Sequence, residues 1–151
     1  MNIRRALPEE FDRLKQLAED IFETEQDIPR ELDHIGPDWL PQWWCLEEDG
    51  ALLGCVALFM EDGEWHMGRF VLSPALRGQH MGTRLLEAAL HDVFRQDIDE
   101  VRMEARDTTV HILKQFGAEV TGAPFPFFRG QVTPMRLTRA AYRQSRTGQQ
   151  D

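Results

Sequence analysis

Two Asp-Gly pairs, at positions 49–50 and 62–63, divide an apolar part of the sequence into three segments. Asp-Gly is a strong signal for a two-residue turn between antiparallel strands, because both residues tolerate a positive φ. The segments 42–47, 51–60 and 65–72 have the composition of strands and are bounded by turn signals. This part of the chain is therefore predicted to form a three-stranded antiparallel meander.

Helical periodicity flanks this meander on both sides. Apolar residues recur at helical spacing from Phe11 to Phe22 and from Met81 to Phe94. A shorter helix over 109–116 precedes Gly117, which suits a left-handed C-terminal cap. Further strands are expected at 2–6, 100–105, 118–125 and 130–137. This order predicts an α+β or α/β protein whose mixed sheet is covered by helices.

Length and composition fit a single globular domain. The chain has 151 residues, of which 42% are hydrophobic and 28% charged, and a chain of this length can bury a sizeable core. We place one domain at residues 1–138. Residues 139–151 are expected to be a polar, partly disordered C-terminal tail, because Ser145 to Asp151 contains no large apolar residue.

Charge and apolar patterning limit the partners of this domain. The formal net charge of −9 argues against a nucleic-acid partner, although a local basic pocket for one phosphorylated cofactor is compatible with it. No apolar run approaches the roughly 20 residues that span a bilayer, so no membrane partner is expected. Because a signal-peptide pattern is absent and Cys45 and Cys55 lie among apolar neighbours, we expect a cytoplasmic location. The histidines lack metal-ligand spacing, so no metal site is expected.

The segment from Arg69 to Leu86 carries the clearest functional signal. A strand ends at 73–74, a turn carries Arg77 and Gly78, and a helix opens near Gly82. The first N–H groups of a helix have no partners within it, and the helix dipole adds positive charge there. The segment is therefore a candidate cradle for a pyrophosphate. Many ordinary strand-turn-helix connections also contain two glycines, so this pattern alone fits a structural turn as well.

This segment resembles the cofactor-binding motif of the GNAT acyltransferases, (Gln/Arg)-x-x-Gly-x-(Gly/Ala). Arg77 and Gly82 match the motif, whereas His80 stands where its first glycine is expected. Residues 21–33 resemble the Val-Phe-x-x-Glu-Gln-x-x-Pro-x-x-x-x-Asp segment of the ElaA/YjcF-like branch, and residues 66–78 resemble its Ile-Gly-Arg-Val-x-Val strand. The resemblance implies the GNAT fold, a three-layer α+β arrangement. Its mixed, mostly antiparallel central sheet has about six to seven strands flanked by helices.

The resemblance also implies a reaction. GNAT enzymes transfer an acetyl or other acyl group from acetyl-CoA, their cosubstrate, directly to an amine in a ternary complex. For this chain the acceptor is expected to be a primary amine of a small molecule. The residues expected to bind the cofactor are Phe70, Val71, Leu72, Arg77, Gly78, Gln79, His80, Met81, Gly82 and Thr83. A backbone N–H at Val71 or Leu72 would polarise the thioester carbonyl.

Three residues are candidates for the base that deprotonates the amine, namely Glu25, His66 and Glu104. Each also has a structural explanation: a carboxylate at a helix end, a histidine on a strand, and a partner for a nearby arginine, respectively. Four residues are candidates for acceptor binding. They are Glu31, Asp33, Arg69 and Phe125. The corresponding structural explanations are solvated charge for Glu31 and Asp33, an ion pair in the sheet for Arg69, and a core or homodimer contact for Phe125.

Several positions depart from the family pattern. Leu113 stands where the superfamily often has a tyrosine that protonates the leaving thiolate, and Thr108 and Ala18 replace the branch's usual His and Arg. These departures favour a second interpretation, a regulatory module that binds acyl-CoA without efficient turnover. A third interpretation, an α+β protein with no CoA site, follows if His80 spoils the cradle.

Overall fold

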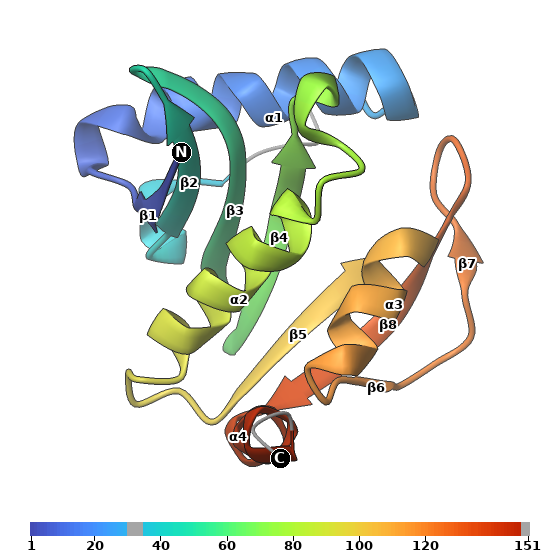
Figure 1. Ribbon diagram of the computed structural model, residues 1–151. Helices are drawn as coiled ribbons and strands as arrows, with labels where there is room; N and C mark the ends of the chain where they lie inside the picture. Colours follow the sequence, from blue (N-terminus) through green and yellow to red (C-terminus); the bar gives the residue numbers. More distant parts are fainter. Residues whose placement is uncertain (30–34, 149–151) are drawn as a thin grey trace.

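The structure, a computed structural model, describes residues 1–29 and 35–148 and contains an eight-stranded sheet (Figure 1). Along the sheet the order is β1-β2-β3-β4-β5-β8-β6, and β7 pairs with β8. The strands are β1 (Asn2–Arg5), β2 (Gln42–Glu48), β3 (Ala51–Glu61), β4 (Glu64–Leu72), β5 (Glu100–Ala105), β6 (Glu119–Val120), β7 (Phe125–Pro126) and β8 (Gln131–Thr138). The α-helices are α1 (Phe11–Gln26), α2 (Met81–Val93), α3 (Asp107–Gln115) and α4 (Arg139–Gly148).

The predicted meander is confirmed as β2, β3 and β4, which pair in antiparallel fashion. Both Asp-Gly turns have positive φ at each residue: 50° and 82° at Asp49 and Gly50, and 52° and 78° at Asp62 and Gly63. Two consecutive positive φ values match the twist of a two-residue hairpin turn to the twist of its strands. The local turn chemistry therefore fixes the centre of the sheet.

The sheet divides into two parts between β4 and β5. These neighbours are parallel, and the only register pair between them is His66 with Arg102. Beyond that pair, toward the carboxyl ends of both strands, they separate, and Figure 1 shows the resulting V-shaped opening. The sheet is therefore continuous at the His66–Arg102 pair and divided beyond it.

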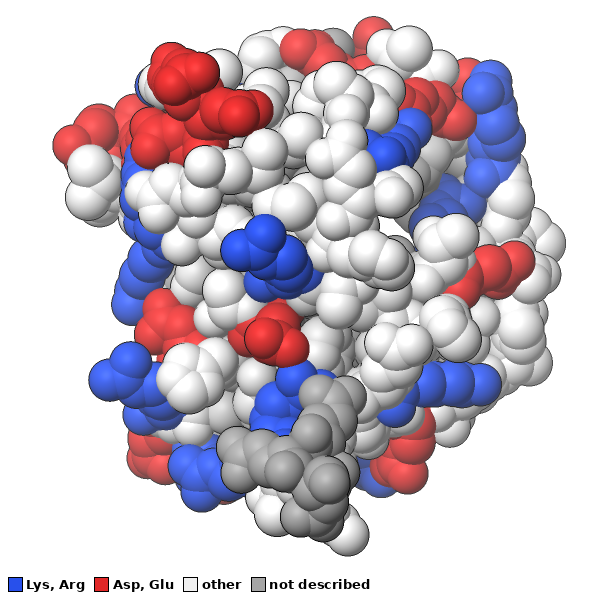
Figure 2. Space-filling model, in the orientation of Figure 1, with Lys and Arg blue, Asp and Glu red and all other residues white. Residues whose placement is uncertain are grey.

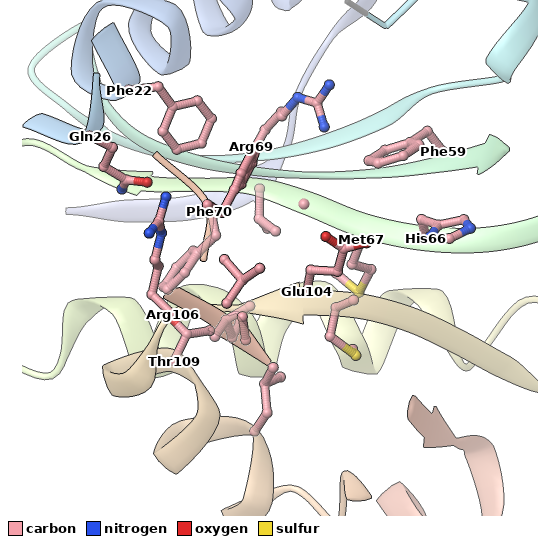
Figure 3. A pocket seen from close by; sticks show the side chains of 18 of the residues that line it. Phe22, Gln26, Phe59, His66, Met67, Arg69, Phe70, Glu104, Arg106 and Thr109 are labelled. Atoms are coloured by element: carbon pink, nitrogen blue, oxygen red, sulfur yellow. The ribbon is translucent and has the colours of Figure 1, made fainter. Parts of the chain in front are cut away.

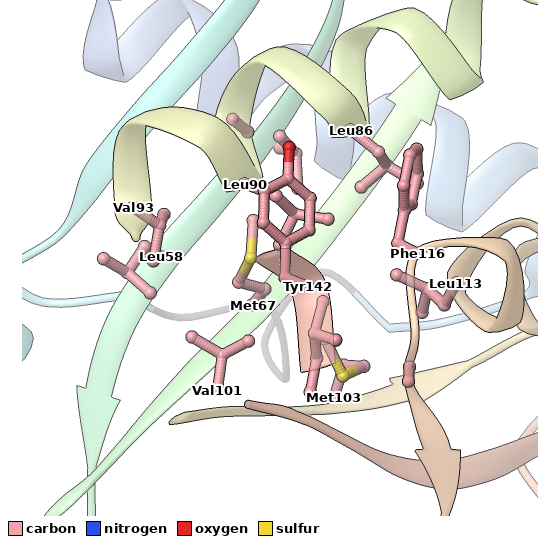
Figure 4. Close-up of a cluster of buried hydrophobic side chains, with 14 of the residues drawn as sticks. Leu58, Met67, Leu86, Leu90, Val93, Val101, Met103, Leu113, Phe116 and Tyr142 are labelled. Atoms are coloured by element: carbon pink, nitrogen blue, oxygen red, sulfur yellow. The ribbon is translucent and has the colours of Figure 1, made fainter. Parts of the chain in front are cut away.

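Helices cover the two faces of the sheet, so the fold has three layers. α1 packs Leu14 and Ala18 against a cluster that includes Trp43 and Cys55 of β2 and β3. On the opposite face, α2, α3 and α4 share one larger core cluster, part of which is drawn in Figure 4. Its members include Leu85 and Leu90 of α2, Leu113 of α3 and Tyr142 of α4. The predicted α+β fold class is confirmed, with eight strands in place of about six to seven.

The C-terminal third differs from the sequence prediction in two places. A continuous strand over 118–125 does not form: β6 and β7 are two-residue strands separated by an irregular segment that contains Pro124. Proline has no N–H to donate to a ladder. Residues 139–148, expected to be tail, form α4. Tyr142 is only 4% exposed and packs on Phe94 and Phe116, so one aromatic residue anchors an otherwise polar helix.

Candidate functional site

A cavity of about 300 Å³ opens where β4 and β5 diverge (Figure 3). Residues 66–70 of β4 form one wall and residues 103–106, at the end of β5, form the other. Side chains of α1, α2 and α3 and of the loop before β8 close its sides. Those side chains are Phe22, Gln26, Leu86, Thr109, Leu113 and Phe127. The cavity is therefore built from every layer of the fold, and it lies at the discontinuity of the sheet.

β4 contains a bulge at the wall of this cavity. Val71 pairs with Cys55 and Gly68 pairs with Ala57, so β4 advances three residues where β3 advances two. Arg69, within the bulge, has a φ of 55°. A bulge takes backbone groups out of the ladder. Here the carbonyl of Arg69 accepts a hydrogen bond from Sγ of Cys55 at 3.4 Å, and Phe70, the next residue of the bulge, lines the cavity. The sequence interpretation placed the polarising N–H at Val71 or Leu72, whereas the structure keeps both in register with β3 and interrupts the ladder at Arg69 and Phe70.

The turn before α2 has the features expected of an anion-binding turn. Gly78 has a φ of 79°, and open space surrounds the position that a Cβ atom would take. His80 is exposed, has a φ of 60°, and precedes α2 without a side-chain hydrogen bond that caps the helix. The first N–H groups of α2 therefore have no side-chain cap. The left-handed conformation of His80 explains why a glycine fits this position in the family motif.

Gly82 has a different role from Gly78. A Cβ atom at Gly82 would lie 3.0 Å from Cζ of Phe70 and 3.2 Å from Cδ1 of Leu72. The small residue thus allows the first turn of α2 to pack directly on β4. Of the residues predicted to bind the cofactor, only Phe70 lines the cavity. Val71 is buried toward α1, and the segment from Arg77 to Thr83 lies at the N-terminal end of α2, outside the cavity lining.

Glu25 contacts the turn rather than the cavity. Its carboxylate lies 2.7 Å from Nη2 of Arg77, which also donates a hydrogen bond to the carbonyl of Leu72. Glu25 is absent from the cavity lining, although Phe22 and Gln26 of the same helix are part of it. The geometry therefore connects Glu25 to the predicted cofactor turn and gives no support to its role as the base.

His66 and Glu104 do line the cavity, from its two opposite walls. The His66 ring stacks on Phe59 at 5.9 Å, and its Nε2 lies 4.0 Å from the carboxylate of Glu64. Glu104 is exposed and makes no ion pair with any other described residue. The structural explanation for Glu104 was a partnership with an arginine, but Arg102 pairs with Glu64 and Glu100 instead.

The acceptor-binding candidates have mixed outcomes. Glu31 and Asp33 lie outside the described residues. Arg69 lines the cavity, with its guanidinium 5.2 Å from the centre of the Phe59 ring. Phe125 is 40% exposed in β7 and is not part of the lining, which contains Phe127 of the same hairpin instead.

The sequence interpretation missed several residues that line the cavity. These include Phe22, Gln26 and Thr109. The spacing of four residues between Phe22 and Gln26 does place both on one face of α1. Nothing in the sequence, however, indicated which side of the sheet that face would meet.

Leu113 is buried and contributes a methyl surface to the cavity. The single tyrosine of the chain, Tyr142, lies elsewhere, and burial raises its pKa. Its hydroxyl donates to the carbonyl of Glu87 at 3.4 Å. No tyrosine is therefore available in the cavity to protonate a leaving group.

Within the described ranges no helix is both long and apolar enough to cross a membrane, and no three His, Cys, Asp or Glu side chains are grouped so as to hold a metal ion. Among the residues coloured in Figure 2, acidic and basic side chains are interspersed, and no continuous basic surface crosses this face. The charged groups that matter for the site are thus those in and beside the cavity.

Comparison with known proteins identifies the family. The model of the acetyltransferase (GNAT) family matches residues 9–118, and the chain therefore belongs to this family. The fold is similar to that of an acyl-CoA N-acyltransferase from Pseudomonas aeruginosa, with 24% identity and a TM-score of 0.73 over 90% of this chain and 99% of that one. Escherichia coli ElaA is 19% identical with a TM-score of 0.75, covering 89% and 97% of the two chains.

A third similar structure is a chimera of the Vibrio cholerae spermidine N-acetyltransferase SpeG and hSSAT. It is 15% identical, with a TM-score of 0.67 over 95% of this chain and 99% of that one. At these identities the likeness concerns the fold. The resemblance to GNAT proteins that the sequence motifs indicated is confirmed, including the structural likeness to ElaA.

Proposed function

We propose that this protein transfers an acetyl group from acetyl-CoA directly to the primary amine of a small molecule. The observation that carries the proposal is the bulged opening between β4 and β5, placed beside an uncapped helix N-terminus. The opening offers backbone groups to a carbonyl, and the helix offers N–H groups to an anion. An acyl thioester attached to a diphosphate requires both features at neighbouring positions.

The donor would bind along β4 and the turn that follows it. Residues 70–72 would pair with its extended arm, while Arg77 and the N–H groups from Gly78 to Thr83 would hold its diphosphate. The residues present fit such a group, because the space at Gly78 is open and no side chain caps α2. When bound, acetyl-CoA supplies an activated acyl group. Contacts along β4 would orient that group toward the cavity.

Two further steps fall to the protein's own residues: removing a proton from the acceptor amine and stabilising the negative charge on the thioester carbonyl oxygen. The acceptor enters as an ammonium ion and must lose a proton before it attacks, and Glu104 and His66 are the groups in the cavity that can take it, directly or through water. The N–H groups of the bulge would stabilise negative charge on the carbonyl oxygen. Leu113 supplies no proton to the leaving thiolate, which departs tolerably unprotonated because a thiol has a pKa near 8.5.

The test is release of CoA thiol from acetyl-CoA in the presence of a broad panel of primary amines. We expect amine-dependent release and an acetylated product detected by mass spectrometry. Glu104→Gln and His66→Gln are expected to lower kcat, and the one that abolishes the rise of rate with pH identifies the base. Glu48→Gln and His111→Gln, at exposed positions outside the cavity, are the matched controls and should leave kcat unchanged.

A second function is favoured by the apolar surface of Leu113 in the cavity and by the absence of a tyrosine there. In this alternative the protein binds acyl-CoA as a regulatory module and does not turn it over. Tight binding of acetyl-CoA, without thiol release for any amine of the panel, would support this alternative against the transferase.

A further inference from the structure

Arg106 is a cation in the cavity that has no anionic partner. Its Nη1 donates a hydrogen bond to the carbonyl of Arg129 at 2.8 Å, and its guanidinium lies 5.6 Å from the centre of the Phe127 ring. No carboxylate among the described residues lies within ion-pairing distance of it. Burial lowers the pKa of this guanidinium, as expected for a charge partly withdrawn from water without compensation.

The surroundings of Arg106 hold it in place. A Cβ atom at Gly130 would lie 3.3 Å from its Nη1, so the absence of a side chain there gives the guanidinium its space. Arg129, whose carbonyl accepts the hydrogen bond, is itself tied to α1 through Asp27 at 2.8 Å and the carbonyl of Glu25 at 3.1 Å. The loop before β8 is thereby anchored to the end of α1, and it presents a fixed acceptor to Arg106.

Other charged side chains near Arg106 already have partners. Arg77 pairs with Glu25, and Arg129 pairs with Asp27. Asp107, next to Arg106 in the sequence, accepts a hydrogen bond from the side chain of Gln131. Of Arg77, Arg129 and Arg106, Arg106 alone lines the cavity, where no described carboxylate pairs with it. Arg69 also lines the cavity, on the β4 wall, with its guanidinium over the Phe59 ring.

Glu104 provides the opposite charge in the same cavity. It lies two residues before Arg106, and an extended strand places side chains two residues apart on one face with Cα atoms about 6.6 Å apart. Figure 3 shows that both side chains rise from the β5 side of the cavity toward the α1 side. They do not pair with each other. The cavity wall thus carries separated negative and positive charges.

We propose that the acceptor is a zwitterion of the amino-acid class, with its carboxylate on Arg106 and its amine beside Glu104. This inference rests on the proposed transferase function. A carboxylate fits because Nε and Nη2 of Arg106 form a fork that one carboxylate can occupy with two hydrogen bonds. The Phe22 and Phe127 rings line the same end of the cavity and suit an apolar acceptor side chain.

Arg106 could instead meet a phosphate of the donor, because a guanidinium binds either anion. A single guanidinium matches the single charge of a carboxylate better than the multiple charge of a diphosphate. The predicted diphosphate turn, with Arg77 and the N-terminus of α2, also lies outside the cavity lining. The acceptor carboxylate is therefore the assignment, and the experiment separates the two sources.

The test compares three sets of acceptors: the protein amino acids, their primary amides and their decarboxylated amines. We expect the best acceptor to be a free amino acid, with kcat/KM at least about tenfold above its amide. Arg106→Gln, which keeps a donor for the carbonyl of Arg129, should lower kcat/KM for the amino acid about tenfold or more and change that for the amide little. Arg95→Gln, an exposed arginine outside the cavity, is the matched control.

Each other outcome overturns the inference. Equal loss on amino acid and amide would make Arg106 a structural residue. A higher KM for acetyl-CoA, absent with S-acetyl-N-acetylcysteamine, which lacks phosphate, would assign Arg106 to the donor. If no amine is acetylated, the transferase function fails independently. Calorimetric titration with 3-phenylpropionate then still tests the anion site. We expect Arg106→Gln to bind this carboxylate more weakly than the unmodified protein does. Equal affinity of the two proteins, or no binding to the unmodified protein, refutes the site.

Discussion

The ion pair between Glu25 and Arg77 leads to a prediction about donor affinity. Glu25 occupies the guanidinium that is expected to hold a diphosphate, so donor binding must displace or share this carboxylate. The side chains of Arg77 and Glu25 are 46% and 32% exposed, and such exposed pairs are worth about 0.2–1 kcal/mol. Glu25→Gln keeps the shape and removes the competing charge. It should therefore tighten CoA binding by about 1.4- to 5-fold.

Calorimetric titration with CoA measures this change, and the gain should shrink as salt rises because exposed charges are screened. Glu9→Gln, which removes the same charge just before α1, controls for a general change in net charge. Kinetics with S-acetyl-N-acetylcysteamine, which has no diphosphate, should be the same for Glu25→Gln and the unmodified protein. A fall in kcat with both donors would refute the reasoning, since it would restore Glu25 as the base.

Three further predictions concern stability. The Glu10 carboxylate accepts hydrogen bonds from Arg4 and from the Leu7 N–H, and these lower its pKa from 4.5 to about 2. The lowered pKa stabilises the fold by about 3 kcal/mol at most. This stabilisation is fully present above pH 4.5 and is lost as the pH falls toward 2. In urea unfolding, Glu10→Gln should therefore cost clearly more stability at pH 6 than at pH 2, where about half of the carboxyl is protonated in the folded state. A pH-independent difference would contradict this. His80→Gly should raise the free energy of unfolding by about 0.5–1 kcal/mol by relieving a left-handed conformation, and a loss would show that the imidazole makes a stabilising contact. Gly117→Ala should cost about 2–4 kcal/mol, because its φ is 101° and the new Cβ would lie 2.7 Å from a carbonyl of α4. A change below about 0.5 kcal/mol would contradict both the left-handed backbone at Gly117 and its contact with α4.

Local chemistry explains which parts of the fold could be predicted from the sequence. The Asp-Gly turns and the apolar spacing of α1 and α2 are readable because each depends on residues close together in the chain. The packing of α4 rests on Tyr142 and Ala141 and on the Arg146 guanidinium over the Phe116 ring, and these residues give no apolar stripe that predicts a helix. The strand predicted over 118–125 forms only as the short strands β6 and β7, and Pro124, between them, has no N–H to donate to a ladder.

The site itself depends on contacts between distant residues. The motif around Arg77 to Gly82 identified the helix N-terminus, because that signal is local. The bulge at Arg69, in contrast, results from the pairing of β4 with β3, and the ion pair of Arg77 with Glu25 joins residues 52 positions apart. Arg106 is not among the cofactor-binding, catalytic or acceptor-binding residues predicted from the sequence. Its place in the cavity follows from the loop at Arg129, which no spacing in the sequence reveals.

The most direct test of the account is thermal unfolding and calorimetry with acetyl-CoA, CoA and acetate. Ligand at about 100 times its Kd should stabilise the fold by roughly 2.7 kcal/mol. We expect acetyl-CoA and CoA both to stabilise the protein, acetate to have no effect, and Arg77→Ala to weaken the stabilisation by both CoA compounds. If neither CoA compound binds, the turn before α2 is not a diphosphate site, and the transferase function must be abandoned.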